Sequence, residues 1–223
     1  MKLVAVIVSR KDSVRIQYKS RKKIKDQNLV ERKISQLKKV KSLNEIYLGT
    51  NDLSLKKLSK KYNIKFIKRE NKYCDERKTS ANEMVKNMLK FVDADIILWA
   101  HVTNPFINHE IYEKAIRLFK KSTKKFDSLF SATLIKNHFW SHKTKPINHN
   151  PFSKKHIVAN KLPPIFAQNG GIFIRFKKDM IKDGRFIGNK PHIFSVNEIE
   201  GWDLDHPWQL ETARTLVKLN YVK

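Results

Sequence analysis

Four polar side chains follow the first apolar run of the chain with a spacing that suits phosphate binding. Residues 3–8 are apolar and rich in β-branched side chains, a pattern typical of a strand buried on both faces of a parallel sheet. Ligands of open α/β sheets bind beyond the carboxyl ends of such strands. Arginine offers phosphate a planar fork, and lysine adds a point charge. We therefore predict a phosphate cradle of three cations and one hydroxyl: Arg10, Ser13, Arg15 and Lys19.

This cradle differs from the common phosphate-binding loops. No glycine lies between Arg10 and Lys19, so the segment is neither a Walker loop nor a Rossmann fingerprint. The alternative interpretation is a solvated basic loop in a lysine-rich protein. The pattern by itself leaves both interpretations open.

An acidic pair near the end of the chain is the second group of candidate residues. Asp203 and Asp205 belong to segment 197–207, where acidic residues reverse the prevailing positive charge. In an extended segment, the side chains of residues i and i+2 point to the same side. Two such carboxylates can hold Mg²⁺, which takes one or two carboxylates together with waters and substrate phosphates. We predict a magnesium site here, with a salt-bridged loop as the alternative.

A phosphate cradle and a magnesium site in one chain indicate phosphoryl or nucleotidyl transfer. The cations would hold a triphosphate, and a magnesium ion on the acidic pair would stabilise charge on the transferring group. The two motifs together are stronger evidence than either motif alone.

Strand and helix patterns alternate along most of the chain, and the elements that they predict must bring these groups together. Short apolar runs predict strands at residues 3–8, 45–49, 64–67, 95–100, 128–133, 170–174 and 193–196. Apolar residues at helical spacing predict helices over residues 29–40, 54–63, 80–91, 110–121 and 207–219. Such alternation implies a mostly parallel sheet with helices on both faces. We expect one α/β domain over residues 1–223.

Residues 135–164 interrupt this alternation. The segment is too long for an ordinary loop, and its aromatic residues include Phe139, Trp140 and Phe152. Exposed aromatic side chains indicate a surface that packs against another subunit. We expect an excursion that packs in this way, with a floppy basic insertion as the alternative.

Length and composition bound the class of protein. The chain has 223 residues, 40% of them hydrophobic, and no apolar run of about 18 residues, so we expect a globular protein without a transmembrane helix. Cys74 is the single cysteine, which suits the reducing cytoplasm. The net charge of +26 favours nucleic-acid binding, but the lysines are spread along the whole chain and no zinc-finger or aromatic RNA-binding motif occurs. We expect no specific nucleic-acid partner, and a basic nucleic-acid-binding protein is the competing class.

Several short motifs resemble those of the sugar-activating cytidylyltransferases, above all the acylneuraminate (CMP-sialic acid synthetase) group. Residues 7–15 with Lys19 are similar to that family's P-A-R-G-G-S-K-R opening and following lysine. Residues 202–205 match its I-D-I-D metal site. Its S-T-D-D, T-S-P-L and N-G-A-I-Y segments resemble residues 49–52, 103–106 and 168–173. The likeness covers nearly the whole chain.

The resemblance implies a Rossmann-like nucleotidyltransferase fold and a reaction of CTP with an acidic nine-carbon or eight-carbon sugar, which yields a CMP-sugar and pyrophosphate. It implies catalytic roles for Arg10, Arg15, Lys19 and Asp203, and a Mg²⁺ cofactor on Asp203 and Asp205. Beyond the cradle, it implies nucleotide contacts from Arg69, Thr79 and Ser80. It implies sugar contacts from His101, Thr103, Asn104, Asn169 and Phe173. Because residues 135–164 lie where the family has a dimerisation arm, it also implies a homodimer.

The chain departs from the family pattern at several positions. Lys11 and Asp12 replace two glycines, which changes how closely the backbone can approach a triphosphate. His101 occupies the position of a glutamine that faces the sugar. Two further interpretations stay open. One is a 3-deoxy-octulosonate cytidylyltransferase, which has the same R-x-x-S-x-R start, and the other is a non-catalytic relative that only binds nucleotide.

Overall fold

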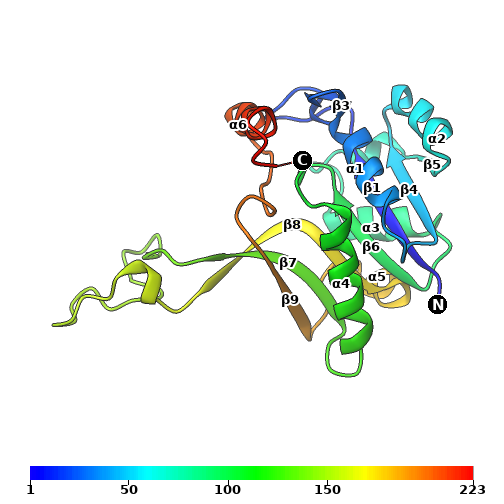
Figure 1. Cartoon of the computed structure of the whole chain (residues 1–223). Coiled ribbons are helices and arrows are strands. Elements are labelled where there is room, and N and C mark those ends of the chain that lie inside the picture. The colour runs from blue at the N-terminus through cyan, green and yellow to red at the C-terminus, as the bar shows by residue number, and fades with distance from the viewer. Residues whose placement is uncertain (223) are drawn as a thin grey trace.

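A single large sheet organises the computed structural model, which describes residues 1–222. Its strands are β1 (Leu3–Ser9), β4 (Glu45–Thr50), β5 (Lys65–Lys68), β6 (Ile96–His101), β7 (Ser128–Ile135), β8 (Ile165–Phe176) and β9 (Pro191–Val196). Within residues 1–222 they form seven strands in the order β5-β4-β1-β6-β8-β7-β9 (Figure 1). The predicted α/β class with a mostly parallel sheet is confirmed.

Strand β1 lies in the middle of the parallel part of the sheet. It pairs in parallel with β4 on one side and β6 on the other, so that Val8 lies beside His101. Its side chains alternate between two apolar clusters, with Leu3, Ala5 and Ile7 in one and Val4 and Val6 in the other. Burial on both faces therefore explains the continuous apolar run, and the polar cradle begins where this strand ends.

Helices cover both faces of the sheet (Figure 1). One apolar cluster takes side chains from α1 (Leu29–Lys38), α2 (Lys56–Tyr62), α4 (His109–Ser122) and α6 (Pro207–Lys218). The other takes side chains from α3 (Ala81–Leu89) and α5 (Lys177–Asp183). Side-chain oxygens of Asn28, Ser80 and Asn108 accept hydrogen bonds from the first turns of α1, α3 and α4, which explains where these helices begin.

Strand β8 is the exception to the parallel arrangement, because it runs antiparallel to both of its neighbours, β6 and β7. β7 leads into the excursion and β8 returns beside it, so the pair forms a long ribbon. The register between them shifts after Phe130, where Ser131 Oγ donates to Asn169 Oδ1 at 2.6 Å and accepts from Ile172 N–H at 2.9 Å. β8 begins at Ile165, five residues earlier than the predicted strand, because its first part belongs to this ribbon.

The excursion, residues 136–164, extends away from the sheet as an arm at the end of the β7–β8 ribbon (Figure 1). Side-chain hydrogen bonds hold its base: Asn148 Oδ1 accepts from Phe139 N–H at 2.9 Å, and Asn148 Nδ2 donates to the Asn137 carbonyl at 2.8 Å. Trp140 is 49% exposed and Phe152 is 85% exposed. The arm thus presents large apolar side chains to its surroundings.

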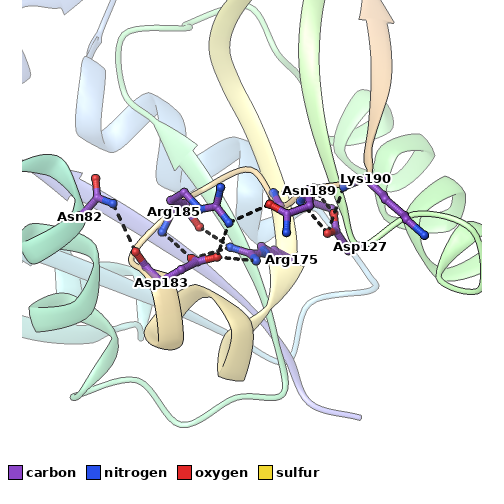
Figure 2. A network of polar contacts seen from close by, with 9 residues as sticks. Asn82, Asp127, Arg175, Asp183, Arg185, Asn189 and Lys190 are labelled. Atoms are coloured by element: carbon purple, nitrogen blue, oxygen red, sulfur yellow. Dashed lines mark hydrogen bonds and ion pairs between the residues drawn. The ribbon is translucent and has the colours of Figure 1, made fainter.

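A polar network occupies the corner where β8, α5 and β9 meet, and Figure 2 shows it. Arg175 on β8 donates two hydrogen bonds to the two carboxylate oxygens of Asp183, at 2.8 and 2.9 Å. Arg185 N–H and its guanidinium add 2.9 and 3.0 Å bonds to the same carboxylate. These contacts fix the connection between α5 and β9.

Several short elements of the structure were not predicted from the sequence. They are α5, the hairpin β2 (Lys23–Ile24) with β3 (Gln27–Asn28), and short 3₁₀ turns that include Lys19–Arg21. No helix within residues 1–222 is long and apolar enough to cross a membrane.

Candidate active site

A cavity of about 390 Å³ opens at the carboxyl ends of β1 and β6. All four predicted cradle residues line it, together with Thr103 from the turn after β6. The other lining residues are Val8, Ser9, Val14, Ser20, Glu76 and Val102. The cradle prediction and one predicted sugar contact therefore meet at one place, as the position of β1 in the sheet requires.

The loop that carries the cradle is tied to the end of β4. Asn51 Oδ1 accepts from Lys11 N–H at 2.9 Å. Arg21 makes a fork of two 2.6 Å hydrogen bonds to the two carboxylate oxygens of buried Asp52. Because both ends of the loop are held, its cations have a defined place although the loop contains no glycine.

Two cradle cations contact Asp205, one residue of the acidic pair. Arg15 donates to Asp205 Oδ1 at 2.7 Å, and Lys19 Nζ donates to the same oxygen at 3.1 Å and to the Leu204 carbonyl at 2.7 Å. Arg10 instead pairs with Glu76 at 3.1 Å. The structure therefore brings together two motifs that lie about 190 residues apart, as the separations of 185 and 190 residues in these bonds show.

Asp203 has the features of a cation ligand. Burial raises the pKa of its carboxyl group, a hydrogen bond with Thr103 lowers it, and the nearby charge of Asp205 raises it again. Its Oδ1 is buried and has no hydrogen-bond partner in the part of the chain that the structure describes. Described residues contain no cluster of three or more metal-ligating side chains. The donor set therefore fits Mg²⁺, which needs one or two carboxylates and takes its other ligands from water and phosphate.

Two cavity residues escaped the sequence analysis. The hydroxyls of Ser9 and Ser20 are buried, line the cavity, and have no hydrogen-bond partner among residues 1–222. Buried hydroxyls usually have such a partner, so these two groups are available to a polar ligand. Their only sequence signal is adjacency to Arg10 and Lys19, which is too weak to single out two serines.

The three residues expected to contact the nucleotide outside the cradle have different surroundings. Arg69 is buried and donates to the Ser9 carbonyl at 3.4 Å and to the Tyr73 carbonyl, while its Nε has no partner among the described residues. Thr79 donates to the Lys72 carbonyl at 2.8 Å. Ser80 forms the capping box of α3 with Glu83. Arg69 thus contacts the backbone of Ser9, a residue that lines the cavity, whereas the two hydroxyls are engaged in local structure.

Asn104 and Asn169 belong to a buried network next to the cavity. Asn104 Nδ2 donates to the Asn169 carbonyl at 2.8 Å and to the Trp202 carbonyl at 3.3 Å. The Asn169 side chain is held by β7, since its Oδ1 accepts from Ser131 and its Nδ2 donates to Thr133 at 3.1 Å. The geometry gives Asn169 a structural task, and it leaves Asn104 Oδ1 without a partner among the described residues.

His101 and Phe173 lie together on adjacent strands. The His101 ring meets Phe173 at 5.8 Å and Phe186 at 6.0 Å between ring centroids. Burial lowers the pKa of His101 to about 4, and the positive charges of Lys33 and Lys19 add to this. His101 is therefore neutral at physiological pH. Phe173 is only 2% exposed, so it supports the histidine from within the core.

Solved structures show the same fold. CMP:2-keto-3-deoxy-manno-octonic acid synthetase complexed with CTP matches with a TM-score of 0.71 and 15% identity, over 99% of this chain and 100% of that chain. The 4-diphosphocytidyl-2C-methyl-D-erythritol synthase of Anaerococcus prevotii matches with a TM-score of 0.68 and 14% identity, over 97% and 96% of the two chains. A cytidylyltransferase from Leptospira borgpetersenii matches at 0.54 and 16%, over 82% and 63%.

The sequence adds a family assignment to this likeness of fold. No curated protein sequence matches the chain. A sequence model of the cytidylyltransferase family matches residues 4–221, which is nearly the whole chain and includes the cradle and the acidic pair. The chain belongs to the cytidylyltransferase family.

Proposed function

We propose that this cytidylyltransferase uses CTP to activate an acidic 2-keto-3-deoxy sugar, with release of pyrophosphate. The observation that carries the proposal is that two cations lining one cavity, Arg15 and Lys19, bond Asp205. Thr103, which lines the same cavity, hydrogen-bonds Asp203. The sugar we expect is sialic-acid-like, as the sequence motifs imply. A CMP-sugar synthetase needs both halves of this site, cations for the phosphates and carboxylates for a metal ion.

The cradle residues bind and orient the triphosphate in this proposal. Arg10, Arg15 and Lys19 offset the phosphate charges, and their hydrogen-bond donors hold the α-phosphorus where the sugar hydroxyl can attack it in line. Arg15 and Lys19 exchange Asp205 for phosphate oxygens as the nucleotide enters. The hydroxyls of Ser9 and Ser20 supply further donors that the described residues do not use.

Asp203 and Asp205 would hold Mg²⁺ on the side of the cavity formed by the turn after β6. When bound, Mg²⁺ supplies positive charge that stabilises the charge developing on the α-phosphate. Asp203 is partly buried, and that burial raises the pKa of its carboxyl group, so a bound cation would stabilise its ionised form there. Neutral His101 can donate one hydrogen bond and accept one, which suits a polar group of the sugar.

A 3-deoxy-octulosonate sugar is the second candidate substrate. The observation that favours it is the solved synthetase of CMP:2-keto-3-deoxy-manno-octonic acid, which shares the fold over 99% of this chain. Both candidates are 2-keto-3-deoxy acids, so the predicted chemistry at the α-phosphorus is the same. They differ in the length of the sugar, which is set by the sugar pocket and not by the cradle.

Pyrophosphate release tests the proposal. The purified protein is incubated with Mg²⁺, one of the four nucleoside triphosphates, and either a nine-carbon or an eight-carbon 2-keto-3-deoxy acid. We expect release that needs both CTP and one of the sugars, and that stops when EDTA removes the metal. Release without any sugar, equal rates with all four nucleotides, or no release with either acid would each contradict it. The better of the two sugars decides between the candidates.

We also propose a homodimer formed through the arm of residues 136–164, acting in the cytoplasm where CTP is available. The exposed aromatic side chains Trp140 and Phe152 support a surface that a second copy covers. Light scattering at micromolar concentration should give twice the chain mass. Replacing Trp140 and Phe152 together by serine should shift the protein toward the monomer, and a wild-type monomer would remove this role for the arm.

A further inference from the structure

A buried lysine lies behind the site and takes no part in the function proposed so far. Lys33 on α1 is 1% exposed. Its Nζ donates to the Asn104 carbonyl and to the Tyr112 hydroxyl, both at 2.8 Å. Removing an amine from water is unfavourable, and an apolar side chain of similar size would stabilise the core more. The role of a lysine at this position must therefore lie in the groups to which its amine donates hydrogen bonds.

What Lys33 holds is one side of the turn that follows β6. Its α1 neighbours grip the same turn: Arg32 Nε donates to the Pro105 carbonyl at 2.9 Å, and Gln36 Nε2 donates to the same carbonyl at 2.7 Å. Three side chains of one helix thus bind two consecutive carbonyl groups. The Asn104 carbonyl receives its bond from Lys33.

The other side of this turn holds the acidic segment. Leu204 N–H donates to the Thr103 carbonyl at 2.9 Å, and Asn104 Nδ2 donates to the Trp202 carbonyl at 3.3 Å. The Thr103 side chain also hydrogen-bonds Asp203. The turn therefore hydrogen-bonds the residues on both sides of Asp203, Trp202 and Leu204. Side chains of α1 in turn hydrogen-bond the carbonyl groups of the turn.

We propose that Lys33 is a positioning residue for the metal-binding carboxylate: by holding the Asn104 carbonyl it fixes the turn against which Asp203 is set. The proposal rests on the function proposed above, because it assumes that Asp203 binds the cation. Lys33 itself is not among the residues that line the cavity. Its effect reaches Asp203 through two hydrogen-bonded steps, from Lys33 to Asn104 and from the turn to residues 202–204.

Hydrogen exchange at the Leu204 amide tests the positioning directly, without any need for activity. Lys33→Met keeps the length of the side chain and removes its donors. We expect Leu204 exchange to become about tenfold faster, the factor that corresponds to a hydrogen bond of about 1.4 kcal/mol. Exchange at Val6 in the central strand should stay unchanged. Lys38→Met, an exposed change on the same helix, should alter neither amide.

Magnesium dependence gives the functional readout. In Lys33→Met, the Mg²⁺ concentration for half-maximal pyrophosphate release should rise about tenfold, while the KM for CTP should change less than about threefold. Tyr112→Phe, which removes one of the two acceptors of Lys33 and keeps the packing, should give a smaller shift in the same direction. If Lys33 were purely structural, Lys33→Met would lower thermal stability but would not change the magnesium dependence more than the KM for CTP.

The two proposals fail in different ways. If the wild type releases no pyrophosphate, the proposed function is wrong, and Leu204 exchange still decides the role of Lys33. If wild type is active but folded Lys33→Met shows wild-type exchange at Leu204 and wild-type magnesium dependence, Lys33 has no positioning role. If Lys33→Met does not fold, Lys33→Gln, whose shorter side chain loses the bond to the Asn104 carbonyl, carries the same two measurements, and wild-type values in that variant overturn the proposal.

Discussion

Two clusters of charged side chains lie at different ends of this molecule, and one carboxylate of each, Asp183 and Asp203, differ in how fully they are hydrogen-bonded. At the corner of β8, α5 and β9, both oxygens of Asp183 accept hydrogen bonds, from Arg175, from Arg185 and from a backbone N–H (Figure 2). Asp127 nearby accepts from Ser128 and from two backbone N–H groups. At the cavity, Asp203 is partly buried and its Oδ1 has no partner among the described residues.

The difference separates a carboxylate that holds the fold from one that awaits a ligand. The Arg175 fork holds the pKa of Asp183 well below its usual range, with Arg185 contributing. Burial raises the pKa of Asp203 above its usual value. A saturated carboxylate stabilises the folded state, whereas an unsaturated one costs stability that only a bound cation recovers. Asp183 and Asp203 thus differ in what their oxygens accept, and this difference indicates different tasks for the two residues.

Asp203→Asn should give the largest effect. The change keeps the shape and removes the charge that the cation needs, so we expect turnover to fall about 10²- to 10³-fold, the range for losing one preorganised electrostatic group. The free energy of unfolding should stay equal or increase, because the buried Oδ1, which has no hydrogen-bond partner among the described residues, no longer carries charge. Steady-state rates and urea unfolding measure the two quantities. An unstable but active variant would make Asp203 a structural residue like Asp183.

Asp183→Asn should give the reverse pattern. Arg175 has a side chain only 6% exposed, so losing its charged partner should lower the free energy of unfolding by about 3 kcal/mol. Turnover per folded molecule should be unchanged, because the corner lies away from the cavity residues. Asp179→Asn on the same helix is the matched control. The Asp179 side chain, in the first turn of α5, makes no hydrogen bond or ion pair within residues 1–222, so the change should cost little. Loss of activity in folded Asp183→Asn would contradict the assignment of a structural role to Asp183 and a catalytic role to Asp203.

Lowering the pH should reduce the difference in unfolding free energy between the wild type and each of the two variants, Asp203→Asn and Asp183→Asn. A carboxylate with a lowered pKa stabilises the fold above its unfolded pKa of about 3.9, and this contribution is lost as the pH falls through the folded value. A carboxylate with a raised pKa costs stability above that folded pKa and costs nothing once both states are protonated. From about pH 7 to about pH 3, the advantage of Asp203→Asn should vanish and the deficit of Asp183→Asn should shrink. Differences that stay constant across this range would exclude the assigned pKa directions.

Much of this architecture was predictable because it depends on local patterns. The apolar run before Arg10 indicates a strand buried on both faces, and the position of that strand explains why the cradle lies at a cavity. The spacing of Asp203 and Asp205 indicates a pair of carboxylates on one segment. The contact of Asp205 with Arg15 and Lys19 depends on topology, and the family motifs were needed to expect it.

Other features depend on three-dimensional contacts that no local pattern records. The direction of β8 follows from the return of the chain beside β7, and periodicity does not distinguish parallel from antiparallel strands. Lys33 looks like one more lysine on a basic helix, and only its neighbours Asn104 and Tyr112 reveal a buried donor. Asn169 fits a substrate-binding motif, but in the fold its amide is held by β7.

The register shift between β7 and β8 links two properties that could otherwise evolve separately. Ser131 and Asn169 form the shift, and Asn169 is bonded to Asn104 beside the cavity. Beyond the shift, the same two strands become the arm. The register shift therefore bends the ribbon, and the direction of the arm depends on side chains that also contact the site. A substitution at Ser131 or Asn169 would therefore change both the surroundings of Asn104 and the direction of the arm.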